Sequence, residues 1–159
     1  MLARLKTRGP DDAWRRLGAI IDWFADVQAA GGYRDYYARP GRGTLQGGGV
    51  AGGLGCDQEF LESVLVPHLL LEGFLGLEPT AEGLRLAARL PAAWPSLTVR
   101  GIHLHGGVID VTAERSGPVT IDLIRPASRP LEVETRSGGG RLDAEHPRLR
   151  LPDRPPSGR

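Results

Sequence analysis

Prolines divide the second half of the chain into short pieces. They recur at six positions between residues 78 and 135, namely Pro79, Pro91, Pro95, Pro118, Pro126 and Pro130. Proline lacks an amide hydrogen and clashes with the preceding helical turn, so these intervals do not favour long helices. The intervals are rich in β-branched and aliphatic residues, which favour strands. Five strands are therefore expected, at 84–90, 97–105, 108–113, 119–124 and 131–135.

Two of these strands alternate between apolar and polar residues, so each should have one buried and one solvent-exposed face. Gly106-Gly107 and Ser116-Gly117-Pro118 are hairpin signals between neighbouring strands. The pattern predicts a small antiparallel β-sandwich domain over residues 78–136. Residues 137–159 are polar and rich in proline and glycine, so they are expected to form a largely disordered tail, with one short strand at 149–151.

The first half of the chain has helical periodicity. A wide apolar face runs from Ala13 to Ala30, preceded by two aspartates and followed by two glycines. A second, almost wholly apolar helix ends at Gly76, with Pro67 expected to kink or split it. Its start is open between Val50 and Asp57. The fold class expected is α+β, with an antiparallel helical hairpin over residues 1–77 that precedes the sandwich.

Composition limits the classes of partner. The formal net charge is +1 and neither sign dominates, so neither nucleic acid nor a membrane surface is expected as a partner. A single cysteine, Cys56, excludes an intrachain disulfide framework. The first ten residues lack the apolar core of a secretory signal, and no run is long and apolar enough to span a bilayer. A soluble, cytoplasmic chain is expected.

A glycine-rich stretch, GTLQGGGVAGGLGCD, runs from Gly43 to Asp57 directly before the apolar helix. Backbone amides without a neighbouring β-carbon can approach a ligand closely, and amides at a helix start attract anions or sugar oxygens. The stretch lacks the Gly-Lys-Ser/Thr ending of a phosphate-binding P-loop, and no strand precedes it. By itself the pattern indicates a glycine-rich turn that leads into a helix.

The segment from Leu90 to Leu97 reads Leu-Pro-Ala-Ala-Trp-Pro-Ser-Leu and is followed by short strands. This Leu-Pro-x-x-Trp-x-x-Leu motif resembles the junction that follows the catalytic barrel in glycoside hydrolase family 65 and related (α/α)6-barrel glycosidases and phosphorylases. The upstream order is similar too: an amphipathic helix, a loop, a glycine-rich stretch and an apolar helix that ends in Gly-Phe-Leu-Gly-Leu. The resemblance covers roughly residues 11–125.

The resemblance implies a function that this chain does not complete alone. Such enzymes close a barrel of six helical hairpins before a small antiparallel sandwich, whereas this chain has sequence for about one hairpin. It would be the C-terminal portion of an enzyme acting on α-glucosides, inactive alone because the general acid lies earlier in the family's chain. The loop residues that would border the sugar or phosphate are Thr44, Gln46, Gly47, Gly48 and Gly49. Related fucosidases carry an aspartate in this loop, where Gly47 and Gly48 stand here, so no catalytic residue is expected.

The partner implied is a carbohydrate, with phosphate as an alternative, and no cofactor is expected. Two other functional classes stay open. One is a non-catalytic carbohydrate-binding or accessory module, in which Trp94 and the tyrosines at 33, 36 and 37 stack on sugar rings. The other is a subunit whose apolar helices complete a partner's barrel or associate with a second copy. Core packing is the competing interpretation for Trp94, and hairpin-corner packing for the tyrosines.

The remaining polar residues favour structural interpretations. Asp57 and Glu59 point in different directions on a helix and are better dipole partners than a catalytic pair, while burial of Glu62 would be of interest. His103 and His105 share a strand face without a third ligand, so no metal site is expected. His68 is expected to be a hydrogen-bonded core histidine, and Cys56 has no evident base partner.

Overall fold

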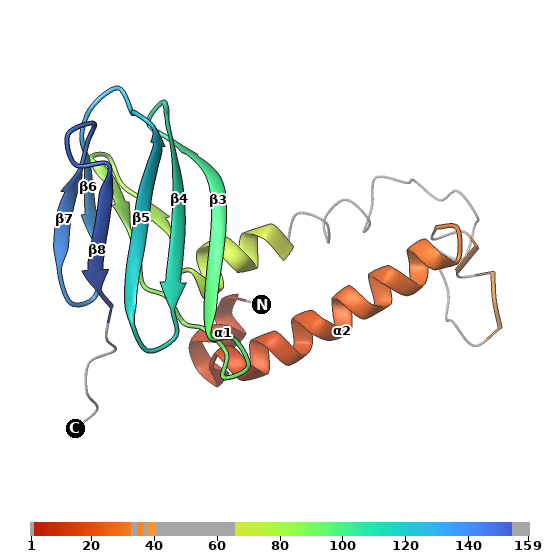
Figure 1. Cartoon of the computed structure of the whole chain (residues 1–159). Coiled ribbons are helices and arrows are strands. Elements are labelled where there is room, and N and C mark those ends of the chain that lie inside the picture. The colour runs from red at the N-terminus through yellow and green to blue at the C-terminus, as the bar shows by residue number, and fades with distance from the viewer. Residues whose placement is uncertain (1, 33–34, 37, 41–65, 154–159) are drawn as a thin grey trace.

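The computed structural model describes residues 2–32, 35–36, 38–40 and 66–153, with side chains from Leu5 onward. Three helical elements precede the strands: α1 (Leu2–Arg8), α2 (Pro10–Ala29) and the π-helix η1 (Leu69–Phe74). Figure 1 shows α1 and η1 against the sheets, whereas α2 extends away from them.

Eight strands form two four-stranded sheets. The first sheet has the order β1-β2-β6-β7, from β1 (Glu78–Pro79), β2 (Gly83–Arg85), β6 (Leu131–Glu134) and β7 (Gly139–Leu142). The second has the order β3-β4-β5-β8, from β3 (Ser96–Leu104), β4 (Gly107–Glu114), β5 (Pro118–Arg125) and β8 (Arg148–Pro152). The protein is therefore α+β with a sandwich-like pair of sheets, as the strand pattern predicted.

Four of the five predicted strands lie within a residue or two of β3, β4, β5 and β6. The fifth, predicted at 84–90, ends at Arg85 in β2. Beyond it the chain leaves the sheet, because the amide of Leu86 still bonds Glu134 O at 2.8 Å but that of Arg89 bonds Phe74 O at 2.7 Å in the helical layer. Apolar residues that bond first to a sheet and then to a helix have the same sequence pattern as one continuous strand.

The prediction of a wholly antiparallel sandwich was wrong at one pair. Strands β2 and β6 are parallel, with Gly83 opposite Glu132 and Arg85 opposite Glu134. Parallel neighbours need a long crossover connection. Here the crossover contains β3, β4 and β5, so the chain builds most of the second sheet before returning to the first. Local alternation carries no signal for such a pairing.

The expected disordered tail was wrong for residues 139–152, which form β7 and β8 and close one edge of each sheet. Gly139 and Gly140 hid β7, because glycine has no side chain to show alternation. Strand β8 includes the short strand predicted at 149–151 and extends it at both ends. The domain boundary expected at residue 136 therefore falls inside the sheets. The proposed division at residue 77 stays a prediction, and residues 154–159 lie outside the described part.

The first helical region starts earlier than predicted. Residues 2–8 form α1, and α2 begins at Pro10 instead of Ala13. Gly9, with φ of 85°, joins the two helices, and Pro10 fits the first turn because its missing N–H would have no helical partner there. The helix stops as expected before two glycines with positive φ, Gly31 and Gly32.

The described part of the second helix runs from Val66 through η1. Its start, predicted at Val50 or Asp57, lies outside the described residues. The α-helical turn that contains Pro67 changes to a π-helix at Leu69, two residues after the proline at which a kink or break was expected. Gly76 ends the segment with φ of 64°.

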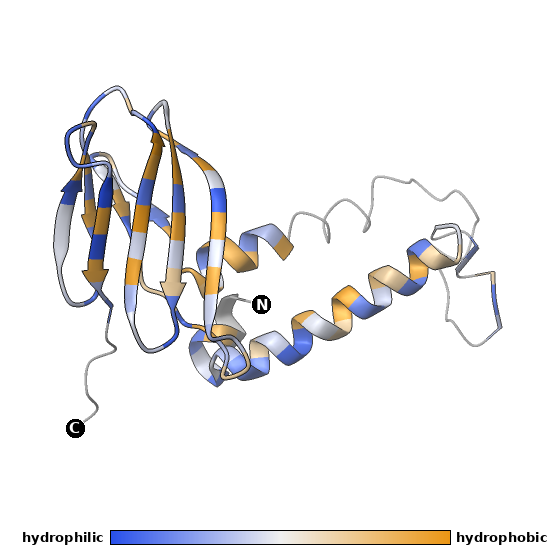
Figure 2. Cartoon of the chain, viewed as in Figure 1, coloured by the Kyte–Doolittle hydropathy of each residue, from blue (hydrophilic) through white to orange (hydrophobic). Residues whose placement is uncertain are grey.

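One hydrophobic cluster joins the layers. The inner faces of both sheets supply Leu84, Ile109, Val111, Ile121, Leu131, Val133 and Leu142, all at most 1% exposed. Leu17 of α2 with Leu69 and Phe74 of η1 belong to the same cluster. Figure 2 shows apolar residues alternating with polar ones along the strands and recurring along α2. Among the described helices, none combines the length and apolarity needed to cross a membrane.

Gly76→Ala is expected to lower the free energy of unfolding by at least about 1 kcal/mol, because a β-carbon is strained at positive φ. It would also come within 2.6 Å of the Ala87 carbonyl carbon. Gly18→Ala is the control, because Gly18 lies inside α2 with nothing within 4 Å of an added β-carbon. This control should gain about 0.5–1 kcal/mol. Urea unfolding of both variants measures the difference, and equal effects would contradict the prediction.

Candidate functional site

The loop residues predicted to border a ligand, Thr44, Gln46, Gly47, Gly48 and Gly49, lie outside the described residues. The same holds for Cys56, Asp57, Glu59 and Glu62. Their roles stay predictions.

The Trp94 motif lies where the helices meet the sheets. The Trp94 ring is 4.8 Å from that of Trp14 in α2 and 5.0 Å from that of Phe74 in η1, centroid to centroid. Both pairs are strongly inclined, at 61° and 53°, which is a favourable geometry for aromatic contacts. Trp94 is partly buried against the core, so its faces are engaged with protein. This agrees with core packing and not with a free stacking platform.

Backbone bonds fix the same junction. The amide of Ala92 donates to Asp11 Oδ1 of α2 at 2.6 Å. Although Asp11 lies in the first turn of α2, this oxygen joins the helix to the motif. Directly after the motif, Ser96 begins β3.

A polar clamp holds the preceding residues. Arg136 Nη2 donates to the carbonyls of Ala87 at 2.6 Å and Ala88 at 2.8 Å, while the Ala88 amide donates to Asp153 Oδ2 at 3.0 Å. Asp153 is 8% exposed, and its Oδ1 is buried without a partner among the described residues. Residues from the end of both sheets thus tie down the segment that leaves β2.

A groove of ≈ 480 Å³ opens where α1, η1 and β1 meet. Its size lies in the range of about 300–1,000 Å³ typical of small-molecule sites. The lining residues are Leu5, Lys6, Glu72, Gly73, Gly76, Leu77, Glu78, Pro79, Ala87 and Arg89. The apolar members form much of the wall, and the four charged side chains are all exposed. The lining thus combines apolar groups with four charged side chains at its exposed side.

Only some of the charged side chains that line this groove have a charged or basic partner among the described residues. His68 Nδ1 lies 3.3 Å from Glu72 Oε1, and Glu78 pairs with Arg85 at 3.3 Å. Within the described part of the chain, the structure shows no ion pair for the Lys6 ammonium or the Arg89 guanidinium. Each groove carboxylate thus has a basic neighbour that does not line the groove, whereas its two cations have no ion pair among the described residues.

The π-helix forms one wall of the groove, through Glu72 and Gly73. The π-helix is rare, and its turns occur frequently at functional sites. Directly after it, Gly76 brings the backbone against Ala87, whose amide donates to Gly76 O at 3.1 Å. The groove is therefore built from closely packed backbone.

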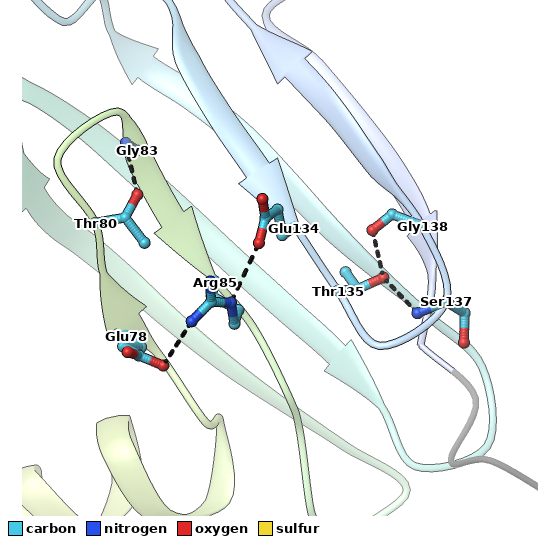
Figure 3. Close-up of polar contacts among 8 residues, drawn as sticks. All are labelled: Glu78, Thr80, Gly83, Arg85, Glu134, Thr135, Ser137 and Gly138. Carbon is cyan, nitrogen blue, oxygen red and sulfur yellow. Dashed lines mark hydrogen bonds and ion pairs between the residues drawn. The ribbon is translucent and has the colours of Figure 1, made fainter.

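Charged residues also cover the outer face of the first sheet. Figure 3 shows Arg85 between two carboxylates, with Nε to Glu134 Oε2 at 3.2 Å and Nη1 to Glu78 Oε2 at 3.3 Å. The hydrogen bond to Glu134 and the charge of Glu78 raise the pKa of Arg85 above its usual value. A second groove, of ≈ 420 Å³, lies beside them and is lined in part by Gly139 and Gly140. Its charges are mutually paired at Arg85, which makes it the weaker ligand site.

The histidines differ from the expectations. His68 is not in the core, because its side chain is 42% exposed and pairs with Glu72. His105 leaves the strand face predicted to hold both histidines: it follows β3 with φ of 48°, and its Nε2 lies 2.9 Å from Thr80 O. His103 remains exposed on β3. No group of three His, Cys, Asp or Glu side chains suited to a metal ion occurs among the described residues.

The junction groove was missed by the sequence argument. Its residues come from positions as distant as 5 and 89, and each is individually ordinary. One available signal was the pair of glycines Gly73 and Gly76 within four residues of an apolar helix end.

No protein-family model matches this chain, and no curated protein matches it. Five solved chains match it in structure. One is named "Putative kojibiose phosphorylase from human microbiome", with a TM-score of 0.46 and 16% identity. The match covers 58% of the present chain and 12% of that chain. The activity in the name belongs to a much longer protein, and a likeness of this size does not assign a function here.

Trp94→Ala should lower the free energy of unfolding by about 2 kcal/mol, somewhat less than the loss for a fully buried tryptophan, since the ring is only partly buried. The matched control is Ile124→Ala, because Ile124 is 60% exposed on β5. It should change stability by about 0.5 kcal/mol or less. Urea unfolding followed by circular dichroism tests both, and a Trp94 effect as small as the control would show that the aromatic contacts are unimportant.

Asp153→Ala removes the acceptor of the Ala88 amide and should cost about 1–3 kcal/mol. Asp153→Asn keeps an acceptor oxygen and should lose clearly less. Thermal unfolding of the pair provides the comparison. If the asparagine variant is as unstable as the alanine variant, the negative charge is what matters and not the bond to Ala88.

Proposed function

We propose that the chain is the C-terminal portion of a carbohydrate-active enzyme, a glycosidase or phosphorylase that acts on α-glucosides, and that it has no activity alone. The observation that carries this proposal is the position of the Leu90–Leu97 motif. Its resemblance to the segment between barrel and sandwich predicts contacts with helices on one side and a strand on the other. Trp94 packs on Trp14 and Phe74, and β3 starts at Ser96.

The ligand-bordering residues of this proposal are Thr44, Gln46 and Gly47–Gly49, with sugar or phosphate oxygens as their partners. Backbone amides in a glycine-rich turn suit such oxygens, and the turn offers no carboxylate for acid or base catalysis. This portion would therefore shape a site whose reacting groups come from elsewhere in the full enzyme. A chain that supplies further helical hairpins would be its partner, and α2 offers exposed apolar surface such as Ile21, 41% exposed.

The accessory-module alternative is less well supported. It needs exposed, coplanar aromatic rings, but Trp94 is engaged by two inclined rings and Tyr36 is only 7% exposed. Buried tyrosine favours corner packing over stacking on sugars. Tyr33 and Tyr37 lie outside the described residues.

The first test is turnover by the purified 159-residue chain. Maltose, trehalose and kojibiose, each with and without inorganic phosphate, are expected to remain intact, because the general acid is not supplied by this chain. Release of glucose or glucose 1-phosphate is the measured quantity. Turnover that survives repeated purification would contradict the proposal of an inactive portion.

Glucose binding at residues 44–49 would distinguish the proposed enzyme portion from an unrelated protein. Amide chemical shifts during a glucose titration are expected to move weakly at residues 44–49. Thr44→Val with Gln46→Leu should abolish these shifts, whereas Thr98→Val on the exposed start of β3 should not. Absence of any change at 44–49 would remove the proposed sugar contact.

A further inference from the structure

We propose that the groove between α1, η1 and β1 binds a small organic anion, with Lys6 and Arg89 holding its charged group. The described lining residues belong to α1, η1, β1 and the segments beside them, whereas the proposed sugar contact is at residues 44–49, outside the described part of the chain. The chemical class is a compact carboxylate or phosphate ester that carries an uncharged, partly apolar body.

The preference for an anion follows from the pairing of the four charged residues. Glu72 and Glu78 are engaged by His68 and Arg85, at 3.3 Å in each case, and neither partner lines the groove. Lys6 and Arg89 line it without an ion pair in the described part of the structure. A guanidinium with free N–H groups can form a bidentate contact with a carboxylate or phosphate, and an ammonium adds a second charge.

The rest of the groove suits the body of such a molecule. Leu5 and Leu77 are 4% and 8% exposed and present limited apolar surface to the groove. Gly73 and Gly76 contribute backbone without a β-carbon to the lining, so no side chain of theirs occupies the groove. Glu72 and Glu78 restrict the anion to the side of the cations, since a negative group near them would be repelled.

Amide chemical-shift titration of the full chain tests the proposal with four separate probes: glucose 1-phosphate, gluconate, inorganic phosphate and glucose. The two organic anions are expected to produce saturable shifts at Gly73, Gly76, Leu77 and Ala87. Inorganic phosphate should bind there more weakly, because it lacks the body, and glucose should leave these amides unmoved. Raising the salt concentration should weaken binding, because exposed charges are screened.

The variant Lys6→Gln with Arg89→Gln keeps most of both stems and should weaken the binding of both organic anions at least tenfold. The matched control Arg129→Gln removes an exposed arginine outside the groove and should change nothing. The variant's spectrum must retain the dispersed strand amides. If it does not, the single variant Arg89→Gln is read out instead, with a loss of at least threefold expected.

The proposal is overturned if neither organic anion saturates the groove amides at about 10 mM, ten times the Kd of a weak millimolar site. It is also overturned if the double variant binds as well as the control. Shifts confined to residues 44–49 would overturn it while supporting the sugar contact of the proposed enzyme portion. Groove shifts without any change at 44–49 would give the opposite result, so the two proposals fail separately.

Discussion

The structure depends on how one segment, residues 86–95, is held as it passes from the first sheet to the helical layer and then to the second sheet. It leaves the first sheet at Leu86, passes the helical layer at Arg89 and Trp94, and enters the second sheet at Ser96. Peptide groups that leave a sheet need new partners, because an unpaired buried amide or carbonyl costs about as much as a lost hydrogen bond. Phe74, Arg136 and Asp153 supply them. The helices and sheets share one core because this segment is fastened to both.

The same segment explains the location of the groove. Ala87 contacts Gly76 closely, which draws the end of η1 against the crossing chain. Arg89 lies two residues later and lines the groove together with Lys6 of α1. Two cations far apart in sequence therefore share a cavity whose two carboxylates, Glu72 and Glu78, have their partners outside the lining. The electrostatic character of the groove is a result of packing and not of a local charge run.

Much of the fold was predictable, because proline positions and alternation act over short distances. Strands β3 to β6 follow directly from them, and Gly76 with its positive φ marks the end of the helical segment two residues after η1. The failures are non-local or involve residues without side-chain signal. Strand β7 is half glycine, and the parallel register of β2 with β6 joins residues 49 positions apart, as in the Arg85–Glu134 bond. The groove was equally hidden, while packing of Trp94 followed from its motif.

The parallel pairing of β2 with β6 also affects the order in which the chain can fold. Strands β3, β4 and β5 are joined by short turns, so their pairing brings together residues that are close in the chain, such as Leu104 and Gly107. Pairing of β6 with β2 must close a far longer loop, and β7 then adds to β6. The hairpins of β3, β4 and β5 in the second sheet are therefore expected to form first. The first sheet is expected to complete the sandwich afterwards. The bonds from Arg136 and Asp153 to residues 87 and 88 span 48 to 65 positions and are expected to form late, so the wall of the groove at Ala87 would be fixed near the end of folding.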